Sequence, residues 1–199
     1  MSQTNLPTGY TIEKEKTVLN EALVIEQGFI QPYSAEKKFD RYKRLRVKRP
    51  DAVVVFIHNT DTDKVVLTRQ FRYAISDKVS EPIPELMAGK IEKGDTALES
   101  AMRESLEETG YRLQPGQIKH LFSVFASPGY STEKFIFYYA SVLESDKIMA
   151  GGGLEEEHEF IEVLEMKYDD LMRLADENKI EDAKTLLALL YIRHHRKKC

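Results

Sequence analysis

The chain has 199 residues, of which 42% are hydrophobic and 31% charged, and its formal net charge is −4. This length allows one or two domains, and the composition is too apolar for a disordered chain. The acidic balance argues against a surface that coats nucleic acid, and no apolar run approaches the roughly 20 residues needed to span a bilayer. The single cysteine, Cys199, cannot form an internal disulfide, and the N-terminus lacks a signal-peptide pattern, so we expect a cytoplasmic protein.

The first region of the chain has strand-like segments between residues 17 and 47, with a polar turn at 31–38. They predict a small antiparallel sheet. Such a sheet buries little apolar surface by itself, so we expect it to pack on something else. We therefore divide the chain into an N-terminal sheet region, 1–49, and a second domain, 50–199.

The second region opens with a continuous apolar run that predicts a buried strand at 52–57. Strands outnumber helices along this region and the two types are interspersed, so the fold class is α+β. The further strands are predicted at 64–73, 83–87, 117–125, 134–143 and 160–166, and the helices at 97–109, 168–178 and 180–193.

The helix predicted at 97–109 carries an acidic cluster and starts near Asp95 or Thr96. Glu104, Glu107 and Glu108 share an arc of roughly 100° on one of its faces. Three like charges so close repel each other, and a hard divalent cation such as Mg²⁺ would stabilise them. The simpler alternative is a solvated acidic face.

That alternative does not account for the glycines and the arginine at fixed distances from the acids. Residues 89–111, GKIEKGDTALESAMRESLEETGY, resemble the Nudix hydrolase signature over its full length. The matching positions are Gly89, Asp95, Arg103, Glu104, Glu107, Glu108, Gly110 and Tyr111. Asp95 stands where the family usually has Glu, and Ser105 occupies an apolar position. The resemblance implies that Asp95 pairs with Arg103, and that this contact is weaker for the shorter carboxylate.

The resemblance also implies an architecture and a metal site. The architecture is the Nudix α/β/α sandwich with a mixed sheet, preceded by a small antiparallel sheet that is used in dimerisation. The metal is Mg²⁺, with Mn²⁺ as the alternative. Its implied ligands are the backbone carbonyl of Ala88 and the carboxylates of Glu104, Glu107, Glu108 and Glu157.

A second acidic cluster, GGGLEEEHE at 151–159, follows three consecutive glycines. From composition alone it is an ordinary exposed loop. In ADP-ribose and nucleotide-sugar pyrophosphatases of the Nudix family, a Glu of the corresponding loop completes the metal site or acts as general base. This resemblance implies Glu157 as the first candidate and Glu159 as the second, and leaves Glu155 and Glu156 open. The expected catalytic residues are Glu157, Glu159 and Glu108.

Further resemblances imply a substrate site. A proline at the position of Pro128 marks the ADP-ribose and nucleoside-diphosphate-sugar branch, and the arginine matching Arg72 binds diphosphate or ribose in relatives. Relatives also hold the base with an arginine of the partner subunit; Arg44 fits this position, although Leu45 stands where a Glu is expected. The residues expected to contact substrate are Arg44, Arg72, Gly89, Pro128, Tyr130 and Glu133.

Taken together, the resemblance implies a Mg²⁺-dependent homodimer that hydrolyses the pyrophosphate bond of a nucleoside diphosphate sugar, of ADP-ribose or GDP-mannose type. Residues 150–165 are more similar to the GDP-mannose branch. No nucleic-acid or membrane partner is implied. A catalytically weak Nudix-fold sensor of nucleotide sugars is the alternative, and the intact Glu104, Glu107 and Glu108 argue against it. RNA cap removal is disfavoured because no basic, aromatic-rich groove is evident.

Overall fold

The structure, a computed structural model, describes residues 6–154, 156 and 159–196. The chain forms two compact units. The N-terminal unit comprises the residues up to 51 together with 125–134, and the core unit comprises 52–124 and the residues from 135 onward. Within the described residues, no helix combines the length and the apolar character that a membrane crossing requires.

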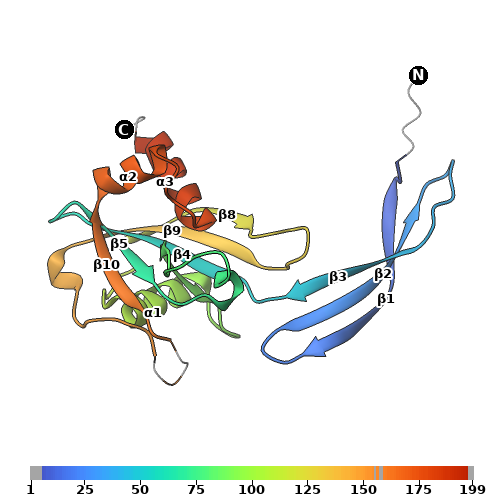
Figure 1. Ribbon diagram of the computed structural model, residues 1–199, viewed down its shortest axis with the longest axis horizontal. Coiled ribbons are helices and arrows are strands. Elements are labelled where there is room, and N and C mark those ends of the chain that lie inside the picture. The colour runs from blue at the N-terminus through green and yellow to red at the C-terminus, as the bar shows by residue number, and fades with distance from the viewer. Residues whose placement is uncertain (1–5, 155, 157–158, 197–199) are drawn as a thin grey trace. The chain divides into compact units, whose positions relative to one another are not determined.

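The N-terminal unit contains the predicted antiparallel sheet, which has the strand order β1-β2-β3 (Figure 1). Its strands are β1 (Gly9–Asn20), β2 (Val24–Tyr33) and β3 (Tyr42–Lys48). The loop at 125–134 joins this unit, because the Val47 N–H donates to the Tyr130 carbonyl at 2.7 Å and Arg49 pairs with Glu133 at 3.2 Å. Every side chain of β1 after its first residue is exposed.

The core unit is built on a mixed sheet with the order β10-β5-β4-β9-β8, to which β6 and β7 are added beside β5 and β4. The pair β4–β9 is parallel and the other pairs along this sheet with printed register are antiparallel. The strands are β4 (Ala52–Asn59), β5 (Lys64–Arg69), β6 (Pro84–Glu85), β7 (Met87–Lys90), β8 (Ile118–Phe125), β9 (Lys134–Val142) and β10 (Glu162–Lys167).

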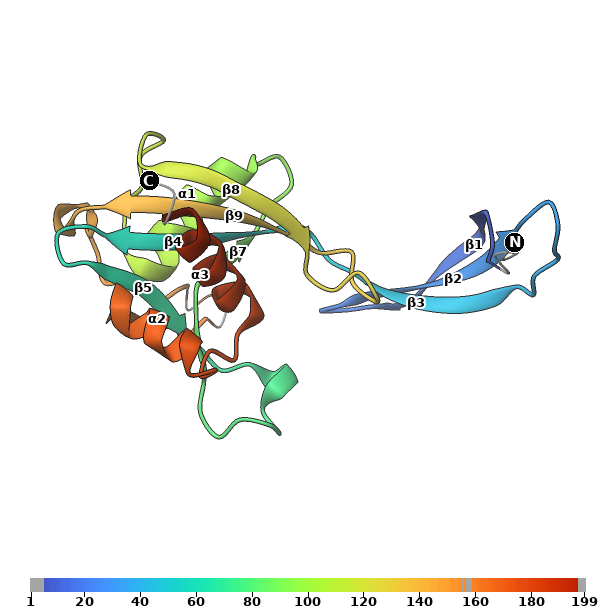
Figure 2. The same ribbon diagram turned by 90° about the horizontal axis from the view of Figure 1, so that it is seen from above.

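Strand β4 is buried at every position because helices cover both faces of the sheet. Val53 and Val55 belong to a core cluster with Ala101 of α1 (Ala97–Thr109). The alternate residue Val54 belongs to a second cluster with Leu171 of α2 (Tyr168–Asp176) and with residues of α3 (Ala183–Arg196). Figure 2 shows α1 on one side of the sheet and α2 and α3 on the other. The predicted α/β/α sandwich with a mixed sheet is confirmed.

Helix α1 has the bounds that the sequence predicted, and both of its ends are closed. Thr96 is the N-cap: its side chain accepts from the Glu99 N–H, and the Glu99 carboxylate accepts from the Thr96 N–H in return. At the other end, Gly110 adopts the left-handed conformation with φ of +79°. A side chain at this position would overlap the Met149 carbonyl.

The strand predicted at 64–73 is too long, because β5 ends at Arg69. Its partner strand β10 begins at Glu162, which lies opposite Arg69, so β10 has no residue that pairs with the chain beyond Arg69. Phe71 and Tyr73 are 70% and 86% exposed in the loop that follows, which contains a short 3-10 helix at Tyr73–Ile75. Aromatic side chains that indicated a strand therefore belong to a loop.

Candidate active site

Helix α1 divides its three acids between two environments. Glu108 is 3% exposed, and the Glu104 side chain is 12% exposed. Glu107 lies further out and accepts a hydrogen bond from Arg103 at 2.9 Å. Glu108 is therefore buried and Glu104, one helical turn away, is mostly buried, while Glu107 is more exposed.

Burial makes ionisation of this pair unfavourable. Burial raises the pKa of Glu108 to about 8, and the charges of Glu104 and Glu159 act in the same direction. Burial likewise raises the pKa of Glu104 to about 7, against the opposing charge of Arg103. Two neighbouring carboxylates with pKa values near neutrality are typical of a functional site rather than of a surface ion-pair network.

The pair has the properties of a cation site. The Oε2 atom of Glu108 is buried and has no hydrogen-bond partner among the described residues, which is rare for a buried oxygen. Within the same residues, no group of three or more His, Cys, Asp and Glu side chains has the geometry to hold a metal ion. Mg²⁺ does not need one, because it takes one or two carboxylates and fills its shell with water and substrate phosphates. The residues present thus fit a hard divalent cation.

Strand β7 supplies the space for Glu104. A Cβ atom at Gly89 would overlap the Glu104 carboxylate, so a glycine at this position lets the acid lie against the strand. Ala88, whose carbonyl the sequence predicted as a ligand, precedes it in β7 and is partly buried. The signature glycine and the first signature glutamate are thus in direct contact.

Arg103 joins the acids on the outer side of α1. Its guanidinium lies 3.0 Å from Glu104 and 2.9 Å from Glu107, and 3.6 Å from Glu92. The Asp95 carboxylate is 3.8 Å away, the longest of these distances. The expected Asp95–Arg103 pair is therefore present, but its separation is long, in keeping with the shorter side chain.

At the other departure from the signature, Ser105 is fully buried and its hydroxyl donates to the Ala101 carbonyl at 2.7 Å.

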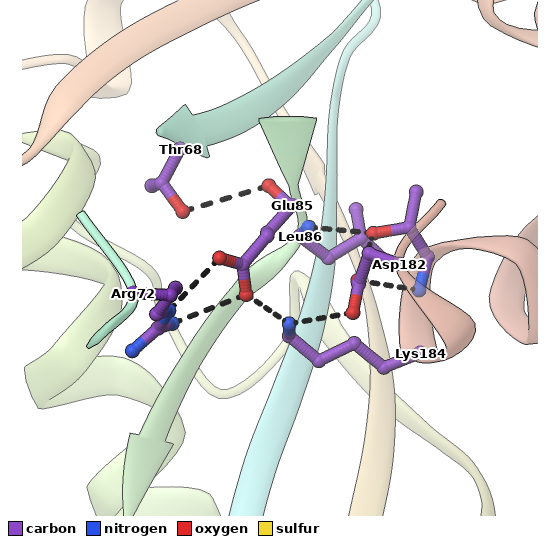
Figure 3. A network of polar contacts seen from close by, with 7 residues as sticks. Thr68, Arg72, Glu85, Leu86, Asp182 and Lys184 are labelled. Atoms are coloured by element: carbon purple, nitrogen blue, oxygen red, sulfur yellow. Dashed lines mark hydrogen bonds and ion pairs between the residues drawn. The ribbon is translucent and has the colours of Figure 1, made fainter. Parts of the chain in front are cut away.

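A second network, shown in Figure 3, holds two positively charged side chains, Arg72 and Lys184. Arg72, after β5, donates to the buried Glu85 of β6 from Nε at 2.9 Å and Nη2 at 3.1 Å. Lys184 of α3 also donates to Glu85, and it donates to Asp182 at 2.9 Å. The charges of Arg72 and Lys184 both lower the pKa of Glu108. Arg72 and Lys184 therefore lie close enough to Glu108 for their charges to act on it, and the expected roles of Arg72, Glu104 and Glu108 toward substrate and metal stay predictions.

Sequence reasoning missed Lys184 and Glu85. Lys184 lies in the first turn of α3, where its neighbour Asp182 accepts from the Thr185 N–H at 3.0 Å, and this pattern indicates only an ordinary helix start. Glu85 lies in a two-residue strand. No local pattern distinguishes either residue from a surface charge.

The loop acids are described in part. Glu155, Glu157 and His158 lie outside the described residues. Glu156 is exposed, whereas Glu159 is partly buried and its charge raises the pKa of Glu104 and of Glu108. Of the two candidate bases, Glu159 is thus the one that the structure describes, and its charge acts on both Glu104 and Glu108.

The other residues expected to contact substrate belong to the N-terminal unit. Arg44 lies in β3, with its guanidinium over the Tyr42 ring at 4.4 Å. Pro128 and Tyr130 are exposed in the loop, and Glu133 is engaged by Arg49. Their roles toward substrate stay predictions.

Comparison with known proteins shows the family of the chain. The NUDIX domain matches residues 48–189, and the chain belongs to the Nudix family of hydrolases. In sequence it is 34% identical to proteins named GDP-mannose pyrophosphatase from Escherichia coli strains K12 and HS, over 154 residues that span 76% of this chain and 78% of theirs. In structure it resembles a protein described as an ADP compounds hydrolase, with a TM-score of 0.74, 21% identity and 95% of each chain covered.

We predict that Glu108→Gln stabilises the metal-free protein and removes its stabilisation by Mg²⁺. A carboxyl group whose pKa is raised from 4.5 to about 8 binds its proton more tightly in the folded state, so its contribution to stability falls as pH rises between these values. The neutral amide removes this cost, and we expect a gain of at least about 1.4 kcal/mol near pH 8, the equivalent of one pKa unit.

Thermal unfolding with and without Mg²⁺ measures both effects. Glu181→Gln, which changes an exposed glutamate, is the matched control and should behave as the wild type. A Mg²⁺-induced shift of Tm that survives in Glu108→Gln would contradict the assignment of Glu108 as a ligand.

We predict that Glu85→Gln destabilises the fold in a pH-dependent way. Burial alone raises the pKa of Glu85, but the hydrogen bond from Arg72 and the charge of Lys184 outweigh it, so the pKa lies below its ordinary value. A carboxyl group with a lowered pKa contributes stability that is complete above its ordinary value of 4.5 and is lost as pH falls through the folded value. The expected loss near pH 7 is about 3 kcal/mol, because Lys184 keeps its charge in a buried position.

Urea unfolding near pH 7 and near pH 3.5 tests this expectation. The difference between variant and wild type should shrink at the lower pH. Glu162→Gln removes a more exposed carboxylate, 3.5 Å from Arg69, and should cost less than about 1 kcal/mol. An equal difference at both pH values would mean that Glu85 is not ionised in the fold.

Proposed function

We propose that this protein is a Mg²⁺-dependent pyrophosphatase of nucleoside diphosphate sugars, of GDP-mannose or ADP-ribose type. It releases a nucleoside monophosphate and a sugar phosphate. The observation that carries the proposal is the Glu104–Glu108 pair, in which one oxygen of Glu108 has no hydrogen-bond partner among the described residues and the charges of Arg72 and Lys184 act on Glu108. A site of this kind attracts a divalent cation and a diphosphate together.

Different residues have different roles in the proposed hydrolysis. A bound divalent cation would neutralise phosphate oxygens and lower the pKa of a bound water. Arg72 presents a planar guanidinium suited to phosphate, and Glu85 holds its orientation through two hydrogen bonds. Lys184 adds a second positive charge for the diphosphate. Water attacks one phosphorus, the bridging oxygen leaves with the other phosphate, and a loop glutamate, Glu157 or Glu159, takes the proton of the water.

The relatives named GDP-mannose pyrophosphatase support the substrate class, and the glycine-rich loop at 150–165 points in the same direction. The contacts to base and sugar are assigned to Arg44, Pro128, Tyr130 and Glu133. Mn²⁺ is the expected substitute for Mg²⁺, since both accept carboxylate and water ligands.

We further propose a homodimer, in which the partner subunit covers the N-terminal sheet. The sheet exposes large apolar side chains, among them Tyr10, Ile12, Val18 and Leu45 at 60%, 54%, 46% and 55%. Apolar surface grouped in this way marks an interaction site. The single cysteine is consistent with a reducing, cytoplasmic compartment.

The proposal predicts turnover of a nucleotide sugar that depends on Mg²⁺ and on Glu108. The measurement is the phosphate released, after addition of a phosphatase, from GDP-mannose, ADP-ribose, UDP-glucose and diadenosine polyphosphates. One nucleotide sugar should be hydrolysed by the wild type and by Glu181→Gln, and not by Glu108→Gln or in the presence of EDTA. No turnover of any compound by the folded protein would favour a nucleotide-sugar sensor instead.

The proposal also predicts that one loop glutamate is the general base. Replacing Glu157 and Glu159 in turn by Gln should lower kcat by at least about a hundredfold for the base and by less for the other residue. The pH dependence of kcat should lose its acidic limb in the variant that lacks the base. If both variants keep nearly full turnover, neither residue has this role.

A further inference from the structure

The glycine triplet Gly151–Gly153 is attached to the end of the helix that carries the acidic pair. The Gly152 N–H donates to the Glu108 carbonyl at 2.9 Å, and the Gly153 N–H donates to the Glu107 carbonyl at 3.2 Å. The last carbonyls of a helix have no partner within it. The start of the acidic loop thus binds the backbone of two of the three signature acids.

The triplet makes this attachment in a conformation and a space that exclude side chains. Its φ angles are +75°, +119° and +77°, in the region that only glycine adopts readily. A Cβ on Gly151 would lie 2.5 Å from the Glu108 carbonyl oxygen. A Cβ on Gly152 would meet nothing closer than the Ile161 carbonyl oxygen, at 3.6 Å, so contact is tightest at the two outer glycines.

Gly153 is in contact with Glu159. A Cβ on Gly153 would lie 2.7 Å from the Cβ of Glu159 and 3.1 Å from its Oε2. The loop returns at this point, since the Glu159 N–H donates to the Leu154 carbonyl at 3.1 Å and the Ile161 N–H donates to the Gly152 carbonyl at 3.0 Å. The Glu159 side chain therefore rests on the bare backbone of Gly153, while Gly153 itself is bound to α1.

We infer that Gly153 is a positioning residue: its missing side chain lets the acidic loop hold the Glu159 carboxylate toward Glu104 and Glu108. This role rests on the proposed function, because it assigns Glu159 to the same cation and phosphate site. The charge of Glu159 already acts on both acids. A side chain at position 153 pushes Glu159 away from the pair, because the nearest atoms to its Cβ belong to Glu159 and, at 3.1 Å, to Ile161, and not to a signature residue.

The test compares Gly153→Ala with Gly94→Ala. Gly94 also has a positive φ, +107°, but a Cβ there meets no atom within 4 Å, so this control places a side chain on a positive-φ backbone without displacing a neighbour. Each variant is combined with Glu159→Gln. Gly153→Asn has the same Cβ and tolerates a left-handed backbone better, and it replaces the alanine variant if that one does not fold.

Two readouts are measured: the Kd for Mn²⁺ in the absence of substrate, and kcat and KM for the nucleotide sugar. Gly153→Ala should weaken Mn²⁺ binding at least about threefold and lower kcat at least about tenfold, or about 1.4 kcal/mol, with KM little changed. In the Glu159→Gln background the same substitution should have no further effect, since residues that act through one another are not additive. Gly94→Ala should leave Mn²⁺ binding and kcat unchanged.

The outcomes separate this inference from the proposed function. Equal effects of Gly153→Ala and Gly94→Ala, or additivity with Glu159→Gln, overturn the positioning role even if the wild type hydrolyses nucleotide sugars. A wild type without turnover, whose Mn²⁺ binding still follows the predicted pattern of variants, overturns the proposed function and upholds the positioning role.

Discussion

The site depends on the burial of two like charges one turn apart on a single helix. A buried carboxylate costs several kcal/mol when it is left without a partner, and Glu104 and Glu108 also repel each other. The fold supplies positive charge to them from three elements: Arg103 on α1, Arg72 after β5 and Lys184 on α3. These positive charges do not fully offset the cost of ionising the two acids, since the pKa of both acids stays above its ordinary value. In the proposed function a divalent cation would complete the balance, and the unfavourable pair would favour its binding.

Both ends of α1 are closed, which suits the proposed role of Glu104 and Glu108, because two ligands must keep their spacing to share a cation. The capping box at Thr96 closes one end of the helix, and Gly110 with the glycine triplet closes the other. Gly89 leaves room for Glu104 in the adjacent strand. Glu107 is the most exposed of the three acids, with 27% of its side chain accessible, and Arg103 pairs with both Glu107 and Glu104.

Much of this arrangement is predictable from local sequence. The bounds of α1, the buried strand β4, the strand β9 and the N-terminal sheet all follow from periodicity and turn signals, and the signature assigned its acids correctly to one helix. The parallel pairing of β9 with β4 was not predicted, because it joins segments far apart in the chain. The predicted extension of β5 to residue 73 was wrong because strand propensity is a local property, whereas the end of β5 depends on where its partner strand begins. The split of the segment at 83–87 into β6 and β7 was also missed, since it results from pairing with β5 and β4 in turn.

The sequence by itself determined the family and the acidic helix face, because these depend on spacings within a turn of helix or within the 23 residues of 89–111. It also determined the fold class, which follows from the order of strands and helices along the chain. Only the tertiary structure decided which of the acids are buried, in which direction and how far their pKa values shift, and which positively charged side chains lie near them. Lys184 and Glu85 are 99 residues apart in the chain and meet through the packing of α3 against the sheet. Burial and long-range charge are properties of that packing, and no local pattern encodes them.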